Sequence, residues 1–245
     1  MRVADETRWR GQFCVATAVV VVLFWAFSWL VDEPVRPGIT ALAAAAVAVP
    51  TLLVTTLAGG LLDATIGDWL EESIAVWELM GARPRIVIGS SMGGWIALLL
   101  ARHLAQQRRA RDLAGLVLIA PAFDMTETLM WRELPQAAKD EIARTGVTYV
   151  PSAYADPYPI TKHLIEEGRS HLLEGRPFDP GCPVRILQGM RDADVPWRHS
   201  LALVDLLASA DVELTLIKDG DHRLSAPHDL QRLTATIATL SGLPE

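Results

Sequence analysis

The sequence predicts an α/β fold in which helices cover a mostly parallel sheet. Segments typical of strands and of helices alternate along the chain from residue 63 onward, and this alternation is characteristic of parallel sheets. The strand-like segments are continuous apolar runs with many β-branched residues, as expected of strands buried on both faces. A length of 245 residues also fits, because α/β folds often reach this size around one core.

The first helix is expected at residues 65–80. Apolar side chains recur there at helical spacing opposite acidic ones, and Gly81 and Pro84 end the segment. A short β-branched run comes next and leads into a second helix. The expected strands are residues 85–89, 113–120, 184–188 and 213–217, and the remaining expected helices are residues 92–109, 197–208 and 227–240.

The strand–helix pattern breaks at residues 123–182. This stretch holds helical pieces and a loop rich in proline and tyrosine at residues 149–159, with no expected strand. A long insertion between two core strands indicates a helical lid. Its apolar side chains either line a site for an acyl chain or simply pack on the core, and they include Met125, Leu129, Met130 and Trp131.

The N-terminal part, residues 1–62, differs in composition from residues 63–245, which are expected to form the α/β domain. Residues 13–31 form an apolar run of 19 residues, close to the roughly 20 that a transmembrane helix needs. Three interpretations stay open: a membrane anchor, unusually apolar strands and helices of the core, or a reading-frame error in the gene. The protein would be membrane-anchored in the first case and cytoplasmic in the last.

A possible nucleophile lies between the expected strand at residues 85–89 and the expected helix at residues 92–109. The pattern G-x-S-x-G centres on Ser91, with a strand before it and a helix after it, which is the context of a nucleophile elbow. In so tight a turn, side chains at Gly89 and Gly93 would collide, and Gly94 would let the helix approach the sheet. The N–H of Met92 would then point to where an oxyanion forms. The pattern alone is also compatible with a structural turn.

A serine nucleophile needs a base and an acid that orients the base. On such an elbow the acid and then a histidine follow the serine along the chain. The loop after residues 184–188 offers Asp192 and Asp194, and the turn after residues 213–217 offers His222. The other histidines are expected to be solvent-exposed and without a catalytic role, namely His103, His163, His171, His199 and His228.

Several motifs resemble one α/β-hydrolase branch, which contains the mitochondrial palmitoyl-protein thioesterase of the abhydrolase-domain-ten type and its bacterial relatives. The motifs are Gly-Ser-Ser-Met-Gly-Gly-Trp at 89–95, Leu-Pro-Gln at 134–136, Cys-Pro-Val-Arg at 182–185, Gln-Gly-Met-Arg-Asp-Ala-Asp-Val-Pro-Trp at 188–197 and Asp-His-Arg at 221–223. The resemblance covers about residues 63–240. It implies the α/β-hydrolase fold and a serine hydrolase of acyl thioesters or esters, with Ser91, Asp192 and His222 as the catalytic triad.

The resemblance fails before residue 63. Members of this branch have a strand there that ends in a glycine-containing loop, which donates a second oxyanion N–H, and the pattern is absent. Losing one such donor lowers the rate by roughly 10²–10³-fold. Two alternatives to a hydrolase therefore stay open: a membrane-anchored non-catalytic relative, and an acyltransferase that uses the same triad.

Composition argues against several other functions. The net charge of −7 and the lack of a long basic run exclude a nucleic-acid partner. The short basic run at residues 108–111 is interpreted as the solvated end of a helix. Cys14 and Cys182 match no metal or redox spacing. We expect no cofactor and no metal, and a small acyl ester or an acylated protein as the substrate.

Overall fold

The main sheet has four parallel strands. The computed structural model describes residues 62–79, 84–151 and 157–241. In these residues the strand order is β1-β2-β5-β6, and every neighbouring pair is parallel. The strands are β1 (Arg85–Ser90), β2 (Leu113–Ile119), β5 (Val184–Gly189) and β6 (Val212–Ile217). The predicted strands are therefore present, and the α/β fold class is confirmed.

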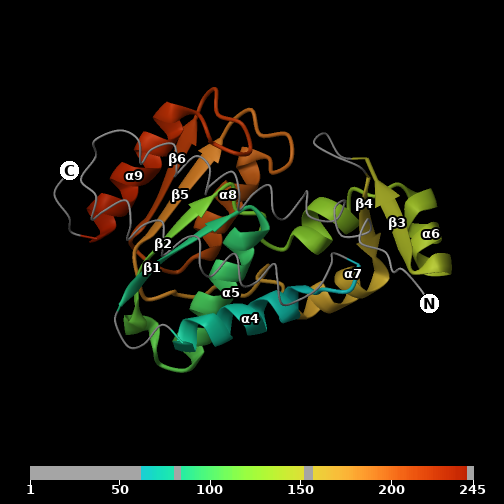
Figure 1. Cartoon of the computed structure of the whole chain (residues 1–245), viewed down its shortest axis with the longest axis horizontal. Coiled ribbons are helices and arrows are strands. Elements are labelled where there is room, and N and C mark those ends of the chain that lie inside the picture. The colour runs from blue at the N-terminus through green and yellow to red at the C-terminus, as the bar shows by residue number, and fades with distance from the viewer. Residues whose placement is uncertain (1–61, 80–83, 152–156, 242–245) are drawn as a thin grey trace, which may run out of the picture.

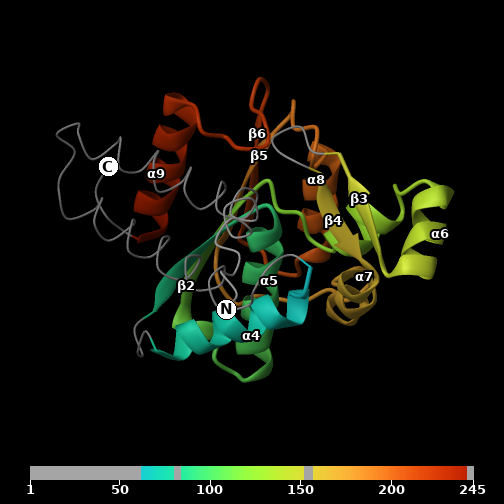
Figure 2. The ribbon, with the colours of Figure 1, turned by 45° about the vertical axis from the view of Figure 1, so that its right-hand side comes forward.

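Helices cover both faces of this sheet (Figures 1 and 2). The helices α4 (Ile66–Leu79), α5 (Met92–Gln106) and α8 (Trp197–Leu206) contribute to one apolar cluster, and α9 (Pro227–Ser241) contributes to another. Successive side chains of a strand point to opposite faces. Accordingly, Leu116 and Leu118 of β2 belong to the first cluster, whereas Val117 and Ile119 belong to the second.

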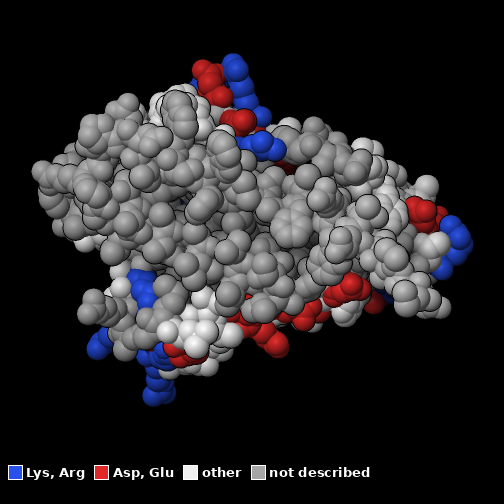
Figure 3. Space-filling view, in the orientation of Figure 1, with Lys and Arg blue, Asp and Glu red and all other residues white. Residues whose placement is uncertain are grey.

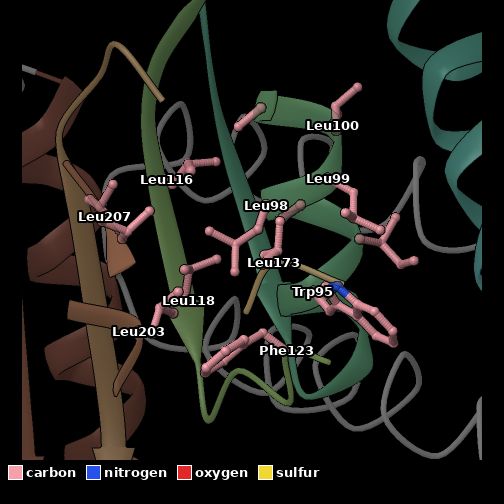
Figure 4. Packing of buried hydrophobic residues seen from close by; sticks show 14 of the residues in the cluster. Trp95, Leu98, Leu99, Leu100, Leu116, Leu118, Phe123, Leu173, Leu203 and Leu207 are labelled. Atoms are coloured by element: carbon pink, nitrogen blue, oxygen red, sulfur yellow. The ribbon is translucent and has the colours of Figure 1, made fainter. Parts of the chain in front are cut away.

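Helix α5 is held firmly by the larger cluster. Leu98 of α5 lies beside Leu116 and Leu118 of β2 (Figure 4), and all three are fully buried. Burying one such side chain stabilises a fold by about 1.5–3 kcal/mol. Because Ser91 directly precedes α5, this packing fixes the position of the predicted nucleophile relative to the sheet.

The inserted segment (residues 123–182) packs as a small unit beside the sheet, at the right of Figure 1. It contains the π-helix η2 (Thr126–Trp131), helices α6 (Gln136–Thr145) and α7 (Lys162–Gly168), the short helix η3 (Arg169–His171), and the strands β3 (Val147–Val150) and β4 (Tyr158–Thr161). A further short helix, η1 (Ala110–Asp112), leads from α5 into β2. The inserted segment has its own apolar cluster, built around Leu134, Ile142, Ile160 and Ile165.

The expectation that this segment lacks strands is wrong. Strands β3 and β4 pair antiparallel, with Tyr149 opposite Pro159. Prolines at residues 151, 157 and 159 favour a loop on sequence grounds, but proline is tolerated in short edge strands, where its missing N–H costs nothing. The β-branched residues Val147, Thr148 and Val150 then favour a strand.

The base of the inserted segment is tied together by Asp124. This carboxylate is completely buried, and it accepts the N–H groups of Leu173 at 2.8 Å and Glu174 at 2.7 Å. Burial raises the pKa of Asp124, although both N–H groups act to lower it. The two ends of the segment, about 50 residues apart in the chain, are thus joined by a buried charged hydrogen-bond acceptor.

The surface of the described residues carries charges of both signs (Figure 3), and acidic side chains gather along the edge where α4 lies. Among the residues that the structure describes, no helix combines the length and apolarity needed to cross a membrane. The apolar run at residues 13–31, and with it the choice among the three interpretations of residues 1–62, lies outside the described residues.

Candidate active site

Ser91 occupies a strained turn between β1 and α5. Its φ of 53° and ψ of −123° are unfavourable for a residue with a side chain. The turn is held by hydrogen bonds to the end of β2. The Ser91 N–H donates to Ile119 O at 2.9 Å, and Ser91 O accepts the N–H groups of Gly94 at 2.9 Å and Ala122 at 3.1 Å. The predicted elbow geometry is therefore present.

The glycines around Ser91 differ in importance. A Cβ on Gly89 would lie 2.4 Å from Gly93 O and 2.8 Å from Gly94 Cα, and a Cβ on Gly94 would lie 2.9 Å from Pro121 Cβ. A Cβ on Gly93, however, would meet no described atom within 4 Å. Among the described residues, the expectation that a side chain at position 93 would collide is therefore wrong. The crowded position is Gly89, where a Cβ would meet the backbone of Gly93.

Asp192 lies in the loop after β5 with a side chain that is 0% exposed. Its Oδ1 accepts the N–H groups of Asp194 at 2.9 Å and Val195 at 2.8 Å. Its Oδ2 accepts the side-chain amide of Gln188 at 3.0 Å. Because a buried carboxylate is costly without such donors, these three bonds allow an ionised group at this position.

Sequence reasoning did not identify Gln188 as part of the site. Its amide nitrogen donates to Asp192 Oδ2 and to Val195 O at 3.1 Å, and its amide oxygen accepts the Ser200 hydroxyl at 2.7 Å. Gln188 thereby fixes the acid-bearing loop to β5 and α8. A polar residue directly after the apolar Ile186 and Leu187 of the strand was the available signal, since buried polar side chains need partners.

His222 lies between Asp192 and Ser91. Its Nδ1 is 2.8 Å from Asp192 Oδ2, and its Nε2 is 3.1 Å from Ser91 Oγ. A carboxylate can only accept hydrogen bonds, so Nδ1 carries the proton and Nε2 is left to accept the serine hydroxyl. The structure thus brings together three side chains that are separated by up to 131 residues in the chain.

The pKa of His222 is the net result of opposing effects. Burial lowers it, but the hydrogen bond that His222 donates to Asp192 and the charges of Asp192, Asp194 and Asp221 outweigh burial and raise the pKa above its usual value of 6.5. Asp221 also shapes the turn, because its carboxylate accepts the N–H groups of Arg223 and Leu224.

Met92 is the first residue of α5. The first N–H groups of a helix have no partner within the helix, so that of Met92 is available beside Ser91. The loop expected to provide a second oxyanion donor would precede residue 63, and its place in the sequence lies outside the described residues.

Three of the histidines expected to be exposed are partly buried, namely His103, His171 and His199. His199 stacks on the Phe123 ring at 4.1 Å and donates from Nε2 to Phe123 O at 2.8 Å. Burial lowers the pKa of His199. His171 lies against Glu167 of α7. For these three residues the expectation of exposure is wrong, whereas His163 and His228 are exposed.

The apolar residues expected to line an acyl site pack largely within the protein. Met125 packs against the main cluster, and Met130 and Trp131 pack against the cluster of the inserted segment. Trp131 also lies below the Arg169 guanidinium, at 5.3 Å from its ring centroid. Of the four candidates, Leu129 is half-buried and belongs to none of the described clusters.

Two carboxylates and an imidazole lie close enough together to be considered as ligands of a metal ion. One atom each from Asp192, Asp194 and His222 lies within 4.8 Å of the others. The oxygens of Asp192 are already engaged by N–H donors. These contacts fit a hydrogen-bonded ion pair and leave few lone pairs for a metal ion.

Comparisons with known proteins identify a family and several similar chains. The family described as "Serine aminopeptidase, S33" matches residues 65–166. The mitochondrial palmitoyl-protein thioesterase ABHD10 of Bos taurus is 36% identical over 184 residues, which cover 74% of this chain and 58% of that protein. The chain thus spans less than two thirds of the length of this curated relative.

Solved structures extend the comparison to three dimensions. A crystal structure from Agrobacterium vitis S4 has a TM-score of 0.71 at 44% identity, covering 74% of this chain and 70% of that one. Alpha/beta hydrolase domain-containing protein 10 from mouse has a TM-score of 0.65 at 32% identity, covering 75% of this chain and 72% of that one. The resemblance drawn from the motifs is confirmed, and the chain belongs to the α/β-hydrolase superfamily.

Proposed function

We propose that this protein is a serine hydrolase that cleaves acyl thioesters or carboxylic esters through an acyl-enzyme. The observation that carries the proposal is the continuous hydrogen-bond chain from Ser91 Oγ through His222 to Asp192, with distances of 3.1 Å and 2.8 Å. Both lie within the reach required between a nucleophile, its base and the group that orients the base.

Each of the three residues has a distinct role in the proposed reaction. His222 Nε2 takes the Ser91 proton while Oγ attacks the substrate carbonyl, and Asp192 stabilises the imidazolium. The N–H of Met92 stabilises the oxyanion. Collapse of the tetrahedral intermediate expels the thiolate or alkoxide, which takes the proton from His222. Water then attacks the acyl-enzyme by the same route and releases the carboxylic acid.

The thioester substrate class is supported by the relatives. The Bos taurus relative is called a palmitoyl-protein thioesterase, and it is 36% identical to this chain over 184 residues. We propose the inserted segment as a lid that covers the acyl group. Leu129, which is half-buried and outside the apolar clusters, is the side chain we expect to contact it.

The proposal is tested by labelling the purified protein with a fluorophosphonate probe, which reacts with activated serines. The protein should be labelled, and Ser91→Ala should abolish both labelling and hydrolysis of an acyl thioester, with kcat falling by about 10⁶-fold. Ser90→Ala is the matched control, because it removes the neighbouring hydroxyl and should keep labelling.

Two results would contradict the proposal. Labelling that persists in Ser91→Ala would exclude Ser91 as the nucleophile. A folded wild-type protein that is never labelled would indicate the non-catalytic relative instead. Product analysis with an added alcohol acceptor distinguishes hydrolysis from acyl transfer, because a transferase would form the ester of that alcohol.

A further inference from the structure

The carboxylate of Asp192 accepts hydrogen bonds from several donors. Besides His222, it accepts the backbone N–H groups of Asp194 and Val195 and the side-chain amide of Gln188. Hydrogen bonds to a carboxylate stabilise its charge. Part of the charge of Asp192 is therefore already compensated before an imidazolium forms at His222.

A second carboxylate lies at the same imidazole. An oxygen of Asp194 is within 4.8 Å of a ring nitrogen of His222 and of an oxygen of Asp192. Asp194 is exposed at the surface, so an ionised carboxylate there keeps most of its hydration. At this separation its charge attracts an imidazolium even without a direct hydrogen bond.

We propose that Asp194 is a second acidic positioning residue, whose charge stabilises the His222 imidazolium that forms when Ser91 gives up its proton. The inference rests on the proposed function. Asp192 orients the ring through a hydrogen bond, and Asp194 adds to the electrostatic stabilisation through space. A carboxylate other than the orienting acid then helps to set the pH range in which His222 acts as a base.

The other groups around His222 do not replace this contribution. Asp192 and Asp194 face the ring from the loop after β5, Asp221 acts on it from its own turn, and Ser91 Oγ faces Nε2. The Asp221 carboxylate is engaged by two N–H groups of that turn. Replacing the Asp194 side chain removes its charge, while the backbone N–H of residue 194 can still donate to Asp192 Oδ1.

The test is Asp194→Asn in the full chain, with the His222 pKa measured by NMR and kcat/KM measured across pH. The pKa should fall by about half a unit, from Coulomb attraction across about 5 Å in a water-like dielectric. Below the inflection, kcat/KM should rise about threefold, because each unit of pKa is a tenfold change in the fraction of free base. An unchanged His222 pKa would overturn the proposal.

Two further variants separate this effect from general ones. Asp219→Asn removes an exposed carboxylate on the β6–α9 loop that pairs with Arg191, and it should leave the His222 pKa unchanged; an equal shift would overturn the proposal. Asp194→Glu keeps the charge and should restore most of the wild-type value. If it behaves like the asparagine variant, charge is not the cause. The NMR measurement does not require catalysis, so failure of the proposed function would be recognised separately by the Ser91→Ala test.

Discussion

The pH dependence of the proposed reaction is determined mainly at His222. As a general base, this residue must be neutral, so activity depends on the fraction of deprotonated imidazole. Burial favours the neutral ring, but the carboxylates around it favour the charged one and raise the pKa above 6.5. Lowering the pH through this raised pKa protonates the base and should remove activity.

We therefore predict that kcat/KM falls on the acid side with an inflection above pH 6.5. Asp192→Asn should lower kcat by about 10⁴-fold, because an amide cannot hold the Nδ1-protonated tautomer, and it should also lower the His222 pKa. The measurement is a pH–rate profile combined with NMR titration of the ring. An inflection at or below the usual histidine value in the wild type would contradict this reasoning.

The elbow between β1 and α5 depends on close backbone contact. Gly89 is crowded by the backbone of Gly93 and Gly94, which cannot move without displacing α5. Overpacking of this kind costs about 1–3 kcal/mol or more. No atom of the described residues would lie within 4 Å of a Cβ on Gly93, and alanine is favoured over glycine within helices.

Gly89→Ala and Gly93→Ala should consequently have opposite effects on stability. The first should destabilise the protein and displace Ser91, with loss of probe labelling. The second should leave the free energy of unfolding unchanged or raise it by up to about 1 kcal/mol. Urea denaturation checks both variants. Similar destabilisation in the two would show that the elbow itself requires glycine at both positions.

The inserted segment depends on the buried Asp124 at its base. Asp124→Asn keeps the size of the side chain and tolerates its positive φ of 53°, but one oxygen becomes an N–H donor that faces a backbone N–H. Loss of one hydrogen bond to a charged group should lower the free energy of unfolding by about 1.5–3 kcal/mol.

Urea denaturation and limited proteolysis measure this effect. In Asp124→Asn, cleavage should increase within residues 123–182 before the main sheet unfolds. Glu133→Gln is the matched control, because Glu133 is an exposed carboxylate of the same segment and its loss should change neither measurement. Equal proteolysis of the control and Asp124→Asn would show that Asp124 does not secure the segment.

At the scale of the whole molecule, the sequence predicts the parts that depend on strand order. Ser91, Asp192 and His222 each follow a strand of the parallel sheet, and the carboxyl ends of such strands share one edge. Their proximity could therefore be predicted. The contacts of Gln188 and His199 could not, because they depend on which side chains of neighbouring elements meet. The β3–β4 hairpin was missed because its prolines outweighed its β-branched residues.

Cys182 reports on the integrity of the whole core. It precedes β5, packs in the main cluster with α5 and α8 and is 6% exposed. Burial, with smaller effects from Asp179 and Asp211, raises the pKa of its thiol to about 12. The thiolate is the reactive form, so the folded protein should resist thiol reagents, and the pKa should return to about 8.5 on unfolding.

This difference in pKa sets the direction in which the stability of the fold changes with pH. The folded state holds the Cys182 proton more tightly than the unfolded chain, so stability should fall as the pH rises above about 8.5. In a Cys14→Ser background, a disulfide reagent should modify Cys182 along the same urea curve as circular dichroism. Modification at the rate of a free thiol without urea would show that the core opens locally around β5, whereas coincident curves would show that the sheet and its covering helices unfold as one unit.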